Sequence, residues 1–129
     1  MKRKNEKSCT LVGSPCWMAP EVMSQSGHNV TADIWSLGIT MLELALGEAP
    51  YSNRDTAKVM CAILNGDPPH LPNIDGFWDK RFEKLINSCL QKNPEKRPSI
   101  AQLLATNSSW FSKAKDCSYL RDNFLQDLP

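Results

Sequence analysis

Residues 13–21 decide how this chain folds, and they read Gly13-Ser14-Pro15-Cys16-Trp17-Met18-Ala19-Pro20-Glu21. Taken alone, Gly-Ser-Pro predicts a turn, because each of these residue types favours tight backbone conformations. Trp17 would then be an aromatic side chain packed partly against a core. The closing Ala-Pro-Glu says little by itself. The residues further along the chain must decide between a simple turn and a functional loop.

Two downstream motifs follow in order, Asp33-Ile34-Trp35-Ser36-Leu37-Gly38 and Lys96-Arg97-Pro98. Together with the first stretch they resemble the C-terminal lobe of a protein kinase, whose activation segment ends in Ala-Pro-Glu. The resemblance implies that Gly13, Ser14, Pro15, Cys16 and Trp17 form the loop beside the protein substrate. Ser14 matches a position where Ser/Thr-specific members carry Thr or Ser, so the resemblance also implies Ser/Thr specificity.

Residues 1–12 precede this loop, and the first eight of them form a basic, polar stretch without apolar periodicity. Such a stretch predicts a mobile, solvated chain end. The resemblance makes it the remnant of an activation loop and places Thr10 where many members carry an activating phosphate. A phosphate there would add about −1.5 to −2 charges. The family's phosphate pocket is built around an arginine of the catalytic loop, which this sequence does not contain.

Three charged residues have roles that only the resemblance implies. Glu21 and Arg97 would pair and hold the activation segment against the helical body; without the resemblance they would be two unrelated surface charges. Asp33 would anchor the catalytic loop of a complete kinase. From its position near a predicted helix start, Asp33 is equally an ordinary favourable first-turn acid.

Hydrophobic periodicity predicts a mainly α-helical fold, with about four to six helices after the activation segment. The clearest helix spans residues 31–46, is apolar at nearly every angle and ends at Gly47. Such a helix is expected to be buried on all sides, as the central helix of the kinase C-lobe is. Further helices are expected after residue 22 and over residues 55–64, 79–91 and 99–104, with Trp110 and Phe111 as a hydrophobic tail to the last. The expected architecture is a kinase C-lobe helical subdomain, an incomplete kinase fold.

The predicted organisation is one partial C-lobe over residues 13–112 and a C-terminal extension, expected to be helical, over residues 113–129. The extension narrows the resemblance, together with the loop motif and Asn65-Gly66-Asp67-Pro68-Pro69. These segments are similar to the SPAK/oxidative-stress-responsive, or Fray-like, branch of the sterile-twenty-type kinases.

Composition narrows the function classes further. The formal net charge of +1 gives no reason to expect a nucleic-acid or membrane partner, and no apolar run is long enough to span a bilayer. The five cysteines are odd in number and form no Cys-x-x-Cys pair, which favours reduced thiols and a cytoplasmic location. His28 and His70 lack neighbouring ligand residues, so no metal site is expected.

The 129 residues contain no Gly-x-Gly-x-x-Gly, no His-Arg-Asp and no Asp-Phe-Gly. We therefore expect no catalytic residue, no cofactor bound by this chain and no phosphate transfer by it alone. ATP and Mg²⁺ are implied for a full-length parent. The first interpretation is the C-terminal portion of a Ser/Thr kinase whose other motifs precede Met1.

The second interpretation is a non-catalytic module that recruits protein substrates or regulators, and the third is an unrelated helical interaction protein. Under the first two, the 31–46 helix would expose an apolar patch that a partner must cover. Its own missing kinase half is one such partner.

Overall fold

The computed structural model describes residues 15–27 and 29–126, and its regular elements in these residues are all helical. The α-helices are α1 (Pro20–Met23), α2 (Thr31–Leu46), α3 (Thr56–Asn65), α4 (Lys80–Cys89), α5 (Ile100–Thr106), α6 (Ser108–Phe111) and α7 (Cys117–Phe124). Two 3₁₀ turns, η1 (Pro15–Trp17) and η2 (Pro94–Lys96), complete the set. The expected mainly α-helical fold is confirmed.

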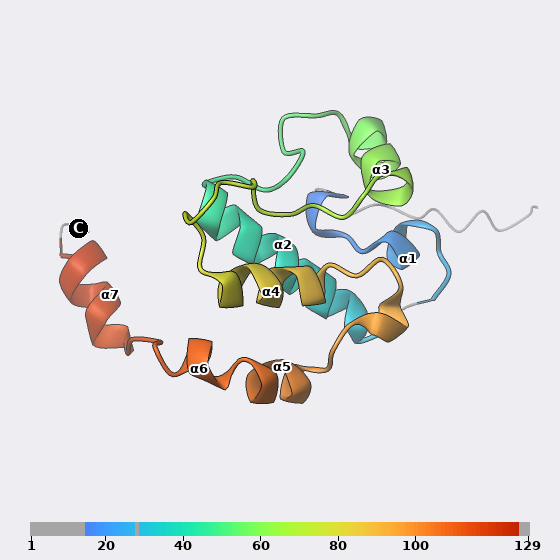
Figure 1. Ribbon diagram of the computed structural model, residues 1–129. Helices are drawn as coiled ribbons and strands as arrows, with labels where there is room; N and C mark the ends of the chain where they lie inside the picture. Colours follow the sequence, from blue (N-terminus) through green and yellow to red (C-terminus); the bar gives the residue numbers. More distant parts are fainter. Residues whose placement is uncertain (1–14, 28, 127–129) are drawn as a thin grey trace, which may run out of the picture.

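Helix α2 runs through the middle of the molecule, and α4 packs along it (Figure 1). The chain folds this way because α2 presents Trp35, Ile39 and Leu42, all 0% exposed, to a core that also holds Ile86 and Leu90 at the end of α4. Gly38 lets the two helices approach closely, since a Cβ there would lie 2.8 Å from Leu90. The packed face of α2 is thus the centre of the fold.

The helix starts follow capping residues that the sequence shows plainly. Asp55 and Asp79 accept hydrogen bonds from the first turns of α3 and α4, and Ser99 forms a capping box with Gln102 at the start of α5. At the other end of α2, Gly47 adopts a left-handed conformation with φ of 86° and terminates the helix. Local sequence signals therefore set most element boundaries.

The C-terminal elements extend along one edge of the molecule and end in α7, which projects away from α2 (Figure 1). The expected hydrophobic tail at Trp110 and Phe111 is in fact the short helix α6, and Trp110 stacks on Phe82 of α4 with ring centroids 5.0 Å apart. This stacking holds α6 against α4, which sequence periodicity alone did not reveal. The described residues contain seven α-helices, and the six that follow α1 agree with the expected four to six.

Helix α2 is not buried on all sides in this chain, and the exposed apolar patch that is expected for a partial kinase lobe is present. Leu44 is 80% exposed and Leu37 is 36% exposed, and both lie on the face of α2 turned away from the core. No described helix is both long and apolar enough to cross a membrane. The exposed leucines form an uncovered apolar face on α2.

Candidate functional site

The loop that the sequence singled out is present in the structure from Pro15 onward. Thr10, Gly13 and Ser14 lie outside the described residues. Pro15 and Cys16 are buried in η1, and Trp17 is half-buried. A hydrogen bond from the Met18 amide to the Pro15 carbonyl oxygen, at 3.0 Å, closes this turn. The loop thus enters the domain as a tight turn packed on the core.

Two side chains of α2 contact Trp17 directly. The Trp17 indole Nε1 donates to Glu43 Oε2 at 3.1 Å, and Ser36 Oγ donates to the Trp17 carbonyl oxygen at 2.7 Å. The ring and the backbone of one loop residue are therefore both held by the central helix.

Behind the loop, Glu21 of α1 forms a buried ion pair with Arg97, 76 positions later in the chain. The pair is bidentate: Arg97 Nη1 donates to Glu21 Oε1 at 2.5 Å, and Nη2 donates to Oε2 at 2.8 Å. Two parallel bonds of this kind fix both side chains in one geometry. Helix α1 is thereby attached to the segment that follows η2.

The Arg97 guanidinium also donates to three backbone carbonyl oxygens. Nε donates to that of Gln91 at 2.7 Å, Nη1 to that of Thr31 at 3.0 Å, and Nη2 to that of Lys92 at 3.3 Å. The guanidinium lies 5.2 Å above the ring of Trp35, within the range of a cation–π contact. Because the Arg97 side chain is fully buried, these partners accept the hydrogen bonds that its N–H groups would otherwise donate to water.

The segment that carries Arg97 is shaped by its own sequence. Asn93 caps η2 by accepting from the Glu95 amide at 2.9 Å, and Pro94 occupies the first turn. Arg97 then follows in an extended conformation, just before Pro98, so its side chain turns back under α1 and α2. The local sequence from Asn93 to Pro98 therefore sets the backbone conformation that positions the Arg97 side chain.

Asp33, the third charged residue singled out, lies exposed in the first turn of α2. Among the described residues its carboxylate has no hydrogen-bond or ion-pair partner. It lines a pocket of about 590 Å³ between α2 and the start of α5, whose lining residues are Val30, Thr31, Asp33, Ile34, Leu37, Arg97, Ser99, Ile100 and Gln102. Asp33 thus takes no part in the Glu21–Arg97 ion pair, although Arg97 lines the same open, largely apolar recess.

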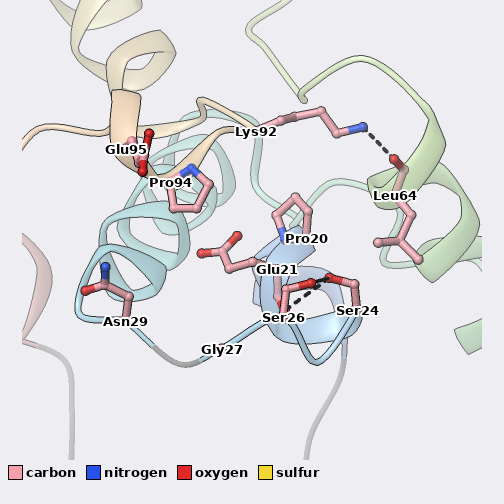
Figure 2. A pocket seen from close by; sticks show the side chains of 10 residues that line it. All are labelled: Pro20, Glu21, Ser24, Ser26, Gly27, Asn29, Leu64, Lys92, Pro94 and Glu95. Atoms are coloured by element: carbon pink, nitrogen blue, oxygen red, sulfur yellow. Dashed lines mark hydrogen bonds between the residues drawn. The ribbon is translucent and has the colours of Figure 1, made fainter.

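A second pocket, of about 530 Å³, is lined by Glu21 together with its neighbours in and after α1 (Figure 2). Lys92 reaches across its rim and donates to the carbonyl oxygens of Leu64 and Gly66 at 2.8 and 2.7 Å, which caps the C-terminus of α3. On the opposite rim, the hydroxyls of Ser24 and Ser26 are 2.7 Å apart and hydrogen-bonded. These rim groups are engaged with the protein itself, so the pocket carries no assembled reactive pair.

Neither pocket gathers metal ligands, because no group of three or more His, Cys, Asp or Glu side chains occurs within residues 15–27 and 29–126. Burial raises the pKa of the Cys89 thiol to about 11, so this cysteine stays protonated and unreactive at neutral pH. The arrangement of the described residues can bind and orient a loop. It supplies no proton-transfer or nucleophilic group aimed at a common point.

Sequence reasoning missed Ser36, Glu43 and Lys92 as residues that hold the site together. A signal existed for Glu43, which is the single charged residue between positions 34 and 46 of a helix that is otherwise apolar or neutral. No local pattern marks Ser36 or Lys92, since their partners lie 19 and 28 positions away in the chain.

Comparison with known proteins agrees with this geometry. The protein kinase domain family matches residues 1–111. Germinal center kinase 3 of Caenorhabditis elegans is 47% identical, over 92% of this chain and 21% of its own length. Serine/threonine-protein kinases fray2 and fray1 of Dictyostelium discoideum are 45% and 40% identical, over 93% and 92% of this chain and 12% and 21% of their own lengths.

The chain thus spans about a fifth or less of the curated relatives that it matches. The relatives confirm the resemblance to the Fray-like branch of the sterile-twenty-type kinases, which rested on the loop motif and the C-terminal extension. An interpretation as an unrelated helical protein is no longer tenable. The chain belongs to the protein kinase domain family.

Proposed function

We propose that these residues are the protein-substrate half of a Ser/Thr protein kinase domain, and that phosphate transfer needs kinase-domain residues that this chain does not contain. The observation that carries the proposal is the contrast around α2. On the packed side, both carboxylate oxygens of Glu21 accept from Arg97 and the helix is covered, whereas the side that holds Asp33 is open.

The open side has the properties of a surface shaped for a missing element. The apolar groups of Val30, Leu37 and Ile100 line its recess, and all three are exposed. The hydroxyl of Thr31, which lines the same recess, is buried without a hydrogen-bond partner among the described residues. A buried hydroxyl without a partner costs about 1–3 kcal/mol. We infer that the rest of a kinase domain covers this face and that Asp33 anchors it there.

The same proposal assigns ATP and Mg²⁺ to the complete kinase and not to this chain. Positioning ATP and Mg²⁺ for phosphoryl transfer requires a glycine-rich loop, a lysine and acidic metal ligands. The sequence contains none of the corresponding motifs, and the described residues hold no cluster of metal ligands. The residues present do not fit the nucleotide and its metal, so no step of the reaction is assigned to them. We propose that the chain is inactive alone and that its loop binds the protein substrate.

The first experiment is calorimetric titration of the purified chain with Mg-ATP. We expect no saturable binding, because the groups that would hold the phosphates and the metal are absent from the sequence. Saturable binding in the micromolar range would overturn the assignment of the nucleotide to other residues.

The second experiment restores the missing half. In a chimera, the upstream kinase-domain half of the C. elegans relative precedes residue 1 of this chain, and transfer to a degenerate Ser/Thr peptide library is measured. We expect transfer, and we expect Leu37→Glu on the open face to weaken association of the two halves expressed as separate chains. The matched control is Leu120→Glu on α7, which is also exposed but lies far from the recess. A folded chimera that binds Mg-ATP yet transfers no phosphate would contradict the proposal.

A second candidate function is a non-catalytic kinase-lobe module that recruits protein partners or regulators. It is favoured by the closed core and the internally satisfied Arg97, which indicate a domain that holds much of its structure without the other half. Sequencing of full-length messages containing the codons for residues 13–21 separates the two. A message with His-Arg-Asp and Asp-Phe-Gly in frame supports the kinase; a message without them supports the module.

We also propose a cytoplasmic location. Among the described residues, the cysteines Cys61, Cys89 and Cys117 are free thiols. Free thiols are typical of reducing compartments. Fractionation of cells expressing the tagged chain tests this, and recovery of the chain in a secretory fraction would contradict it.

A further inference from the structure

Glu43 is out of place in the sequence of α2, and its contact explains why it is there. Between Ile34 and Leu46 the helix carries apolar and neutral side chains apart from this one carboxylate. The Glu43 side chain is half-buried, and its Oε2 accepts the indole N–H of Trp17 at 3.1 Å. A half-buried indole N–H left without an acceptor would cost about 1–3 kcal/mol. Glu43 therefore allows the Trp17 ring to pack against α2.

Ser36 makes a second contact with Trp17, to its backbone and not to its ring. Its hydroxyl lies 2.7 Å from the Trp17 carbonyl oxygen and 3.3 Å from the carbonyl oxygen of Ala32 in its own helix. A serine hydroxyl has one proton to donate, and the shorter contact takes it. Ser36 thus gives up the usual bond to its own helix backbone in favour of the loop.

The two contacts are geometrically matched. Ser36 and Glu43 are seven positions apart, which at about 3.6 residues per turn places them on nearly the same face of α2, two turns apart. One holds the backbone of Trp17 and the other holds the tip of its ring. A residue fixed at both ends has little freedom to rotate, so the backbone of η1 is fixed with it.

We propose that Ser36 and Glu43 are positioning residues that fix the substrate-binding loop through Trp17, with Glu43 acting as a hydrogen-bond acceptor. The inference rests on the proposed function for the role of the loop. Because these contacts lie within the described chain, their effect on the loop is measurable without kinase activity.

The first test uses the purified chain and follows hydrogen exchange of the Trp17 indole N–H and of the Met18 amide by nuclear magnetic resonance. Glu43→Met and Ser36→Ala each remove one hydrogen bond, so we expect the loop to open about 2- to 12-fold more often. Glu43→Gln keeps an acceptor, and Ser36→Thr keeps the hydroxyl, so both are expected to retain most of the protection. Thr40→Ala is the matched control, since it removes an exposed hydroxyl from the same helix that bonds only to the Ser36 carbonyl oxygen.

A double-mutant cycle guards against variants that disturb the fold in general. Trp17→Phe deletes the indole N–H, so combining it with Glu43→Met should add little further exchange at Met18 if the two groups act through one bond. Independent, additive effects would overturn the pairing as the function of Glu43. Unchanged exchange in both Ser36→Ala and Glu43→Met would overturn the positioning role altogether.

The second test uses the chimera described above and separates positioning from general structure. We expect Glu43→Met and Ser36→Ala to raise KM for peptide about 2- to 12-fold while KM for ATP stays unchanged. Glu43→Gln should restore KM for peptide to within about twofold of the parent, because its amide oxygen still accepts from Trp17. If Glu43→Gln is as defective as Glu43→Met, the charge of Glu43 contacts substrate directly and the proposal is wrong. An inactive chimera would count against the proposed function and leave the exchange experiment to decide this inference.

Discussion

The two sides of helix α2 have similar side chains and opposite surroundings. On the closed side, Trp35, Ile39 and Leu42 are 0% exposed and meet α4 and η1. On the open side, Leu37 and Leu44 remain exposed, and Leu37 lines the recess that also holds Asp33. An apolar residue thus indicates that a helix face is to be buried, but it does not indicate which segment buries it. The predictions below change one side or the other.

The largest effect on the loop is expected at the junction of the two sides, from Arg97→Ala. Removal of the guanidinium leaves the buried Glu21 carboxylate without Arg97 and removes one hydrogen bond from each of three carbonyl oxygens. Breaking a buried pair in this way costs about 3–5 kcal/mol. Urea unfolding should show this loss, and hydrogen exchange should rise over residues 15–21.

The control for Arg97 is the double variant Glu21→Ala with Arg97→Ala, which removes the stranded charge as well and should recover part of the lost stability. Arg97→Lys keeps the positive charge but lacks the planar guanidinium, so its stability should fall between those of Arg97→Ala and the unsubstituted chain. Unchanged exchange over residues 15–21 in Arg97→Ala would mean that the pair does not hold the loop.

The closed side also predicts a pH dependence through Cys89, which is 0% exposed where α4 packs on α2. Burial raises the pKa of this thiol from 9.0 to about 11. As the pH rises, the thiol of the unfolded chain loses its proton before the thiol of the folded chain does. The stability that the protonated Cys89 thiol contributes to the folded state is therefore complete below about pH 9 and is lost towards pH 11. Two pKa units correspond to on the order of 2–3 kcal/mol.

Unfolding free energies measured from pH 8 to pH 11 test this prediction when the chain is compared with Cys89→Ala. Lysine and tyrosine titrations are common to both proteins, so the difference in slope isolates the thiol. Parallel curves would show that Cys89 does not titrate differently in the folded protein.

Gly38→Ala overpacks the closed side. A methyl group at this position would lie 2.8 Å from Cγ of Leu90 and 2.9 Å from Cβ of Cys89, so the Leu90 side chain and α4 must both shift to admit it. Overpacking of this kind costs about 1–3 kcal/mol, which outweighs a gain of about 1 kcal/mol in helix propensity. Urea unfolding should therefore show a net loss, with Thr40→Ala on the exposed face of α2 as the control for propensity. A more stable Gly38→Ala would show that α2 and α4 are less tightly packed than the structure indicates.

The sequence contained much of this fold and less of the site. The period of apolar residues and the caps Asp55, Asp79 and Ser99 are local signals, so they predicted the main helices within a few residues. The pairing of Glu21 with Arg97 could be inferred from the kinase resemblance, but not from the two residues themselves. Contacts such as Ser36 with Trp17 join distant segments, and no local pattern encodes which distant carbonyl a hydroxyl will meet.

The smallest effect on stability is expected on the open side, from Leu37→Glu. Its side chain already contacts water, so the free energy of unfolding should change by less than about 0.5 kcal/mol. The same substitution at Leu42, on the closed side, buries a charge and should prevent folding. Sedimentation velocity adds a second measurement: because exposed apolar faces favour self-association, Leu37→Glu should reduce it at high protein concentration. If Leu37→Glu instead destabilises the chain as strongly as Leu42→Glu, then Leu37 has a partner in the isolated chain. The open face would then no longer support the proposal that another half of a kinase domain covers it.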